Sequence, residues 1–199
     1  MENASEVLLL FAHPAFQKSR VNRALLQAAG QIPGIYIHDL YELYPDMLID
    51  VQAEQSLLSR YSRIVWQHPF YWYSAPALLK QWFDLVLQHG WAYGHSGNAL
   101  AGKKVMHVLT AGGPQTSYSR EGGNRYSIPE LTLPFRQTAA LCQMEYLEPY
   151  VVYGAHKLNR EEMTDKTNQY RLVLEEFQST GAYNSAQSKM NEAGENNAR

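Results

Sequence analysis

The stretch VLLLFAHP at residues 7–14 decides the fold class, because it joins a continuous apolar run to a polar turn. An acidic start precedes the six apolar residues 7–12, and His13 and Pro14 follow them. Such a run is typical of a strand that is buried on both faces, as strands in parallel sheets are. A similar run, IVWQHP at residues 64–69, ends in the same His-Pro pair. Both runs therefore predict buried parallel strands that lead into loops.

Strand and helix patterns alternate along the chain outward from this stretch. Five segments have strand patterns: residues 7–12, 35–40, 63–69, 104–110 and 150–153. Helical spacing of apolar residues predicts helices that begin at Ser19, cover 53–61, run from Pro76 to about Gln88, and span 131–142 and 160–178. This alternation predicts an α/β protein with a doubly wound, mostly parallel sheet and helices on both faces.

Composition limits the classes of protein to which the chain can belong. Its 199 residues are 45% hydrophobic and 18% charged, which favours one globular domain, expected at residues 1–180. Residues 181–199 are rich in Asn, Ser, Glu and Ala, and predict a disordered tail. The formal charge of -2 argues against a dedicated nucleic-acid binder. With no basic signal region and no run long enough to cross a membrane, we expect a cytoplasmic protein.

Two motif-like segments and the single cysteine are assigned no function. Residues 97–104, GNALAGKK, resemble a P-loop, but Lys104 stands where Ser or Thr is required and the segment precedes a strand. His89 and His95 lie in a glycine-rich segment without acidic partners, so we expect loop histidines and no metal site. Cys142 excludes a disulfide framework and a cysteine zinc site, and its apolar neighbours predict an inert core residue.

Ligands of doubly wound sheets bind beyond the carboxyl ends of the strands, which singles out residues 13–22, 68–75 and 110–125. The first segment combines a predicted helix N-terminus with Ser19 and basic side chains, which suits a phosphate group. The alternative is that Ser19 only caps the helix and the basic side chains are solvated. Local chemistry does not separate these two interpretations.

The other two segments suit a flat ligand. Residues 70–73, FYWY, are four consecutive aromatics between Pro69 and Pro76, and they favour a heterocycle over an interface patch or a buried corner. The glycine pair of TAGG, residues 110–113, lets the backbone approach a ligand, although such pairs are also common in simple turns. The chain holds 14 tyrosines, which a planar ligand, a subunit interface or a Tyr-rich surface would each explain.

With these loops in view, the chain resembles the flavodoxin-like NAD(P)H:quinone oxidoreductases. Within them it is most similar to the KefF and KefG ancillary subunits of glutathione-regulated potassium efflux systems. The resemblance covers roughly residues 6–155. It rests on these blocks: AHP at 12–14, HDLY at 38–41, VWQHP at 65–69, HGWAYG at 89–94 and LAGK at 100–103.

The resemblance implies a flavodoxin-like fold with a five-stranded parallel sheet, and FMN as the cofactor. It implies a two-electron hydride transfer from NADH or NADPH through the flavin to a quinone. It further implies a homodimer, a potassium efflux transporter as a partner, and a cytoplasmic location or a peripheral one on the inner face of the cell membrane. The sequence does not separate NADH from NADPH.

The resemblance also assigns roles by position. Tyr118 matches the family's substrate-side Tyr, whereas the stretch 121–126 lacks the His that follows in related quinone reductases, so Asn124 or Arg125 is expected to take a partial catalytic role. Two functions stay open: a quinone oxidoreductase, or a regulatory subunit with little or no redox turnover. The residues expected to bind FMN are His13, Ser19, Arg20, Val21 and Asn22 at the phosphate, Phe70, Tyr71, Trp72 and Tyr73 along one edge of the ring system, and Thr110, Ala111, Gly112 and Gly113 on the opposite wall.

Overall fold

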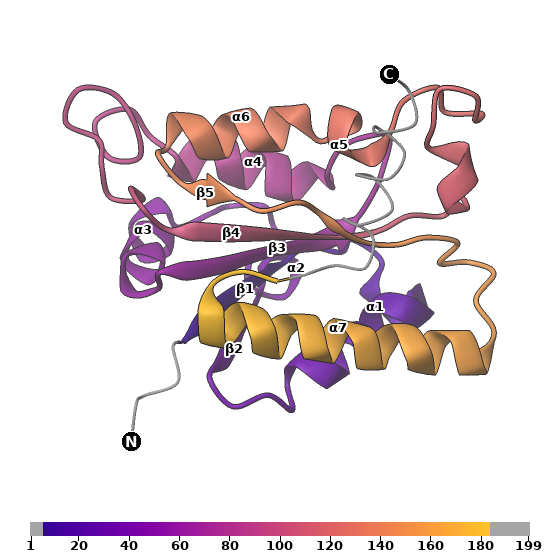
Figure 1. Cartoon of the computed structure of the whole chain (residues 1–199). Coiled ribbons are helices and arrows are strands. Elements are labelled where there is room, and N and C mark those ends of the chain that lie inside the picture. The colour runs from indigo at the N-terminus through magenta and orange to yellow at the C-terminus, as the bar shows by residue number, and fades with distance from the viewer. Residues whose placement is uncertain (1–5, 184–199) are drawn as a thin grey trace.

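A parallel sheet forms the centre of the computed structural model, which describes residues 6–183 (Figure 1). The strand order is β2-β1-β3-β4-β5, and β6 also pairs with β4. This order reverses direction at β1 and β3, which is the switch point where ligands of doubly wound sheets bind. The strands are β1 (Val7–Phe11), β2 (Ile35–Asp39), β3 (Arg63–Pro69), β4 (Lys104–Thr110), β5 (Glu145–Tyr146) and β6 (Tyr150–Val152).

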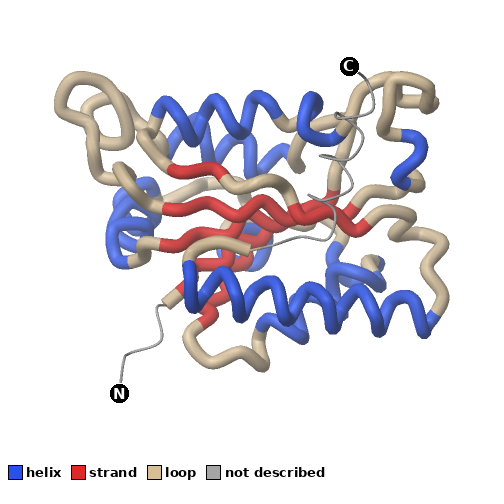
Figure 2. The backbone as a smooth tube through the Cα atoms, viewed as in Figure 1, coloured by secondary structure: helices blue, strands red, loops and turns tan. Residues whose placement is uncertain are grey.

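Helices cover both faces of the sheet, as the alternating pattern predicts (Figure 2). In Figure 1, α4 and α6 lie above the sheet and α1 and α7 below it. The helices are α1 (Arg20–Ala29), α2 (Leu40–Leu43), α3 (Val51–Arg60), α4 (Ala77–Val86), α5 (Ile128–Leu131), α6 (Leu133–Leu141) and α7 (Arg160–Thr180), with short 3₁₀ turns η1 (Phe16–Lys18) and η2 (Gln115–Ser117).

The central strand β1 is buried on both sides, which confirms the interpretation of the apolar run. Each of its five residues has no exposed surface. Leu8 and Leu10 pack on the side of α3, α4 and α6, whereas Val7, Leu9 and Phe11 pack against α1 and α7. Because side chains alternate along a strand, a continuous apolar run serves two cores at once.

The fifth position of the sheet differs from the prediction, because two short strands occupy it. Tyr146 pairs with Val105 and Tyr150 pairs with Val108, so one extra residue bulges out between β5 and β6. Pro149 lies in this bulge and has no N–H to donate to β4. The predicted strand at 150–153 is thus only the second half of the strand.

Two helix boundaries also differ from the prediction. The predicted helix 131–142 begins later, at Leu133 as α6, with Pro134 in its first turn. Leu131 belongs to the separate helix α5, which ends at Thr132, and the Thr132 hydroxyl donates to the Ile128 carbonyl at 2.8 Å. Pro76 precedes α4 as its cap, with an extended ψ of 150°, and does not occupy the first helical position.

The described chain stays packed beyond the end of α7. Gly181 adopts a left-handed φ of 71° and its N–H donates to the Phe177 carbonyl at 2.8 Å, which closes the helix. Tyr183 packs against the core under α7, and its hydroxyl donates to the Glu148 carbonyl. Of the predicted tail, residues 184–199 lie outside the described residues.

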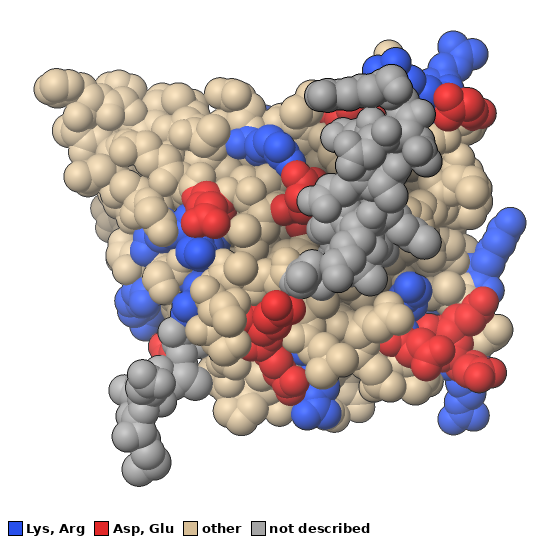
Figure 3. Space-filling view, viewed as in Figure 1, with Lys and Arg blue, Asp and Glu red and all other residues tan. Residues whose placement is uncertain are grey.

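Charges of both signs are interspersed over the face shown in Figure 3. None of the helices described between residues 6 and 183 is long and apolar enough to span a bilayer.

Candidate functional site

A cavity of about 500 Å³ lies at the carboxyl ends of the strands, where the loops after β1, β3, β4 and β6 meet. In Figure 1 this edge of the sheet lies on the right, where α1 and the loop after β4 are drawn. All three predicted segments contribute to the wall of the cavity. The predicted site residues that line it are His13, Ser19, Arg20, Val21, Asn22, Phe70, Tyr71, Thr110, Gly112, Gly113 and Tyr118.

Five predicted site residues do not line the cavity: Trp72, Tyr73, Ala111, Asn124 and Arg125. The side chain of Trp72 is 93% exposed and that of Tyr73 is 49% exposed, so both lie outside it. Asn124 sits in the loop after β4, where its Oδ1 accepts the Tyr73 hydroxyl at 3.2 Å. Ala111 is fully buried, because its N–H pairs with the Val152 carbonyl at 2.9 Å and its methyl group packs into the core.

The loop after β1 presents polar groups to the cavity through the start of α1. Ser19 caps this helix, and its Oγ accepts the Asn22 N–H at 3.3 Å. The Asn22 amide donates to Ser19 Oγ at 3.1 Å and to Thr110 Oγ1 at 2.9 Å, which ties this loop to the end of β4. The buried Oδ1 of Asn22 has no hydrogen-bond partner within the described chain. The cap and the ligand-binding interpretations of Ser19 are therefore compatible.

Basic residues surround this part of the cavity. Lys18 and Arg20 line it with exposed side chains, and Arg20 Nη2 donates to the Leu158 carbonyl at 3.3 Å. Burial lowers the pKa of His13, and its Nδ1 accepts the Ala15 N–H at 3.1 Å. His13 is therefore neutral at pH 7 and offers an Nε2–H donor. The positive field comes from Lys18, Arg20 and the helix N-terminus.

Backbone N–H groups without acceptors occur on two of the loops. That of Gly112 has no acceptor among residues 6–183, and the same holds for those of Trp72 and Tyr73. The Gly113 N–H, in contrast, is hydrogen-bonded to the Tyr118 hydroxyl. Trp72 and Tyr73 have positive φ angles of 49° and 62°, which is uncommon for aromatic residues. Such strain clusters at ligand-binding sites, where it presents backbone groups to a ligand.

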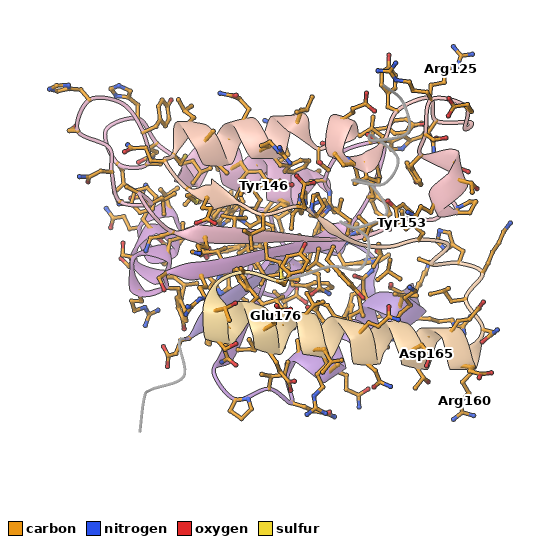
Figure 4. All side chains as sticks on the ribbon, in the orientation of Figure 1. Arg125, Tyr146, Tyr153, Arg160, Asp165 and Glu176 are labelled. Atoms are coloured by element: carbon orange, nitrogen blue, oxygen red, sulfur yellow. The ribbon has the colours of Figure 1, made fainter. Side chains whose placement is uncertain are left out.

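Tyr118 lies on the wall formed by the loop after β4. Burial raises its pKa, so its phenol keeps its proton at neutral pH and can donate a hydrogen bond. Its ring packs 6.1 Å from Phe70 and 5.7 Å from Tyr153, measured between ring centroids. Burial also raises the pKa of Tyr153 to about 12. Arg125 lies farther out, at the tip of this loop (Figure 4).

The sequence analysis missed a fourth loop, which contributes Ala155 and His156 to the cavity. A Cβ added to Gly112 would come within 2.9 Å of the ring of the exposed His156, so the two loops cross closely here. The signal was present: this loop follows the carboxyl end of a predicted strand, as the other three do.

Comparison with known proteins agrees with this architecture. Residues 5–174 match the family described as having a flavodoxin-like fold. The glutathione-regulated potassium-efflux system ancillary protein KefG of Pectobacterium atrosepticum is 47% identical over 170 residues, which cover 85% of this chain and 93% of the relative.

Solved structures are similar along most of the chain. The general stress protein 14 of Treponema denticola, in complex with FMN, has a TM-score of 0.82 at 36% identity and covers 87% of this chain and 99% of its own. An NADPH-quinone reductase from P. pentosaceus has a TM-score of 0.76 at 31% identity, and the match covers 83% of this chain and 95% of the reductase.

The names of similar structures do not all agree. A structure named as a thermophilic tryptophan halogenase from Streptomycin violaceusniger has a TM-score of 0.81 at 46% identity and covers 82% of this chain and 95% of its own. Fold similarity therefore identifies the family, and the activity must be argued from the site. By its sequence match and its fold, the chain belongs to the flavodoxin-like family that includes the KefG proteins and NAD(P)H quinone reductases.

Proposed function

We propose that this protein is an FMN-dependent NAD(P)H:quinone oxidoreductase. The observation that carries the proposal is one cavity at the switch point, which combines a helix N-terminus, the aromatic loop (residues 70–73) and a glycine pair. A phosphorylated flat ligand needs all three features, because its two ends differ in charge and shape.

The residues present fit FMN. The N-terminus of α1 with Ser19, Arg20 and Lys18 would hold the phosphate, and the unpaired Oδ1 of Asn22 would accept a donor group. The unpaired N–H group of Gly112 would donate to an acceptor atom of the ring system. A similar structure contains FMN, which supports this assignment.

When bound, FMN would supply the hydride chemistry that links NAD(P)H to a quinone. The residues of the chain would bind and orient the reactants. Tyr118 would donate its phenolic proton in a hydrogen bond to the substrate, since burial keeps that proton in place. Asn124 would support this end of the site through its hydrogen bond with Tyr73. The exposed Trp72 would be covered by a second copy of the chain in a homodimer.

The visible absorption spectrum of the purified protein tests this proposal. We expect the two flavin bands, their loss when NADPH or NADH is added without oxygen, and their return when a soluble quinone is added. Comparing the two nicotinamides measures the preference that the sequence does not specify. A colourless protein that also fails to take up added FMN would refute the assignment of the loops.

The similarity to KefG supports a second function, that of a regulatory subunit of a potassium efflux transporter at the cytoplasmic face of the membrane. The two functions are compatible. Potassium efflux from vesicles that contain the transporter of the same organism, with and without this protein, separates them. Activation by protein whose flavin is not reduced by either nicotinamide would favour regulation alone.

A further inference from the structure

A hydrogen-bonded series of two buried histidines and the half-buried Tyr146 crosses three neighbouring strands and ends beside the cavity. His107 on β4 lies between Tyr146 on β5 and His68 at the end of β3. The Tyr146 hydroxyl lies 2.6 Å from His107 Nδ1, the two Nε2 atoms of His107 and His68 lie 2.7 Å apart, and His68 Nδ1 lies 2.9 Å from the Pro69 carbonyl. Tyr146 lies on the face of the sheet that α6 covers (Figure 4). None of these three side chains has a part in the proposed reaction.

The Pro69 carbonyl, which is the last acceptor, determines the position of every proton in this series of hydrogen bonds. A carbonyl oxygen can only accept, so His68 carries its proton on Nδ1. Both imidazoles are fully buried, and burial lowers the pKa of His68 to about 4 and that of His107 well below its ordinary value, so both rings are neutral. The Nε2 of His68 is then an acceptor and that of His107 a donor. The Nδ1 of His107 must in turn accept the Tyr146 hydroxyl proton.

The surroundings of the two imidazoles are apolar, whereas the Tyr146 hydroxyl is also hydrogen-bonded by the Thr132 side chain. The Phe135 ring covers both imidazoles, with centroid distances of 4.6 Å to His107 and 5.7 Å to His68. At the outer end, the Arg136 guanidinium lies 5.7 Å from the centre of the Tyr146 ring. Apolar residues would fill this space without the cost of desolvating three polar groups, so the arrangement needs a reason beyond packing.

At the His68 end, this series of hydrogen bonds contacts the start of the aromatic loop (residues 70–73). Pro69 lines the cavity, and the bond from His68 holds its carbonyl turned into the protein. The next N–H, that of Phe70, donates to the Thr110 carbonyl at 2.9 Å. These two bonds orient the peptide that leads into residues 70–73. The Pro69 carbonyl cannot pass a proton on. The three hydrogen-bonded side chains therefore position this peptide and do not conduct protons to the cavity.

We propose that Tyr146 and His107 are positioning residues that act through His68 on the Pro69 carbonyl, and so hold the aromatic loop in the geometry that binds the ligand. The donor on His107 keeps His68 in the one tautomer that can hold the carbonyl. The effect on flavin binding rests on the proposed function, whereas the proton positions do not.

Nitrogen-15 NMR of the full chain with labelled histidines tests the proton positions directly. At pH 7 we expect His68 protonated on Nδ1 only and His107 on Nε2 only. Protons on the opposite nitrogens, or a charged imidazole at either position, would overturn the proposal.

Two substitutions at His107 separate positioning from packing. His107→Phe keeps a buried ring but removes the donor, and we expect a mixture of His68 tautomers, a shifted Phe70 amide resonance and FMN binding weakened about tenfold or somewhat less. His107→Gln restores an N–H donor near the position of Nε2, and should return all three measurements toward those of the wild type. Equal behaviour of the two variants would show that the effect is packing, which would overturn the proposal.

Two tyrosines of the fifth strand position give a milder test and its control. Tyr146→Phe removes only the hydroxyl, and we expect faster solvent exchange of the two imidazole N–H protons and FMN binding weakened about fivefold. Tyr150→Phe is the control, because that hydroxyl lies on the other face of the sheet, 3.4 Å from the Lys166 carbonyl. If the imidazole N–H protons exchange with solvent at the same rate in Tyr146→Phe as in Tyr150→Phe, the result would contradict the proposal. If the wild type binds no FMN, the proposed function fails. The positioning proposal would still be decided by the His68 tautomer and the Phe70 amide resonance.

Discussion

Replacing Glu54 by alanine is expected to destabilise the fold strongly, because its carboxylate is buried and satisfies three donors. Glu54 lies in α3 with 1% of its surface exposed. Its Oε1 accepts His38 Nε2 at 2.8 Å and the Tyr44 hydroxyl at 2.6 Å, and its Oε2 accepts Trp82 Nε1 at 2.8 Å. The carboxylate thus ties α3 to β2 and to α4, the helix that follows the aromatic loop.

The magnitude follows from the donors that the variant leaves behind. His38 and Trp82 are buried at 8% and 1% exposure, so both would stay unpaired, at about 1–3 kcal/mol each. The Tyr44 hydroxyl is only half-buried and can bond water instead. The expected loss for Glu54→Ala is therefore about 2–6 kcal/mol, the sum for the two unpaired donors.

Urea unfolding at pH 7, followed by far-UV circular dichroism, measures this loss as a difference in the free energy of unfolding. The matched control is Glu175→Ala, since Glu175 pairs with Arg171 on the exposed side of α7 at 2.9 Å. That pair should contribute at most about 0.5 kcal/mol. A loss below about 1 kcal/mol for Glu54→Ala would refute the reasoning, because the donors would then have found other partners.

The Glu54 carboxylate also makes a contribution to the free energy of unfolding that depends on pH, and its sign follows from the direction of the pKa shift. Burial alone would raise the pKa of Glu54, but the hydrogen bonds from His38, Tyr44 and Trp82 together lower it. A group with a lowered pKa in the folded state stabilises the fold above its unfolded pKa and stops doing so as the pH falls through the folded pKa. The difference between wild type and Glu54→Ala should hence shrink below about pH 4.

Four further predictions concern the cavity and the end of the chain. Ser19→Ala removes the cap of α1 and should cost about 1 kcal/mol in urea unfolding and weaken FMN in a titration; unchanged binding would exclude a phosphate there. Tyr118→Phe should lower quinone turnover without loss of flavin, and unchanged turnover would exclude its role. Gly112→Val should drive a side chain into the His156 ring and remove the flavin bands while the circular dichroism spectrum persists; retained bands would contradict this. A chain ending at residue 183 should keep its flavin, and a colourless product would contradict that.

Local patterns predicted most of the fold. The continuous apolar run of β1, the strand-forming residues of β2 and the helical spacing of α7 each lie in a short stretch of sequence, so the sequence located these elements. The break between β5 and β6 left a weaker trace, because two- and three-residue strands are too short for a periodic pattern. Thr132 ends α5 through a side-chain bond to its own helix, which spacing does not reveal.

The candidate site was predictable as far as it depends on topology. Parallel strands end at one edge, so the loops that begin at His13, Phe70 and Thr110 had to meet there. The sequence did not show which side chains of those loops face inward, since Trp72 points out to solvent while Phe70 packs inside. Orientation depends on backbone angles such as the positive φ at Trp72, which the pattern of residue types does not reveal.

The sequence by itself determined the order of strands and helices along the chain and the edge of the sheet where the cavity lies, because hydrophobic patterns are local and parallel pairing aligns the strand ends. Only the tertiary structure decided which distant side chains meet. His68 and His107 lie 39 residues apart, and Glu54 and Trp82 lie 28 apart, yet each pair shares a hydrogen bond. Such pairs form only once strand register and helix packing bring them within bonding distance, and no spacing along the chain encodes that distance.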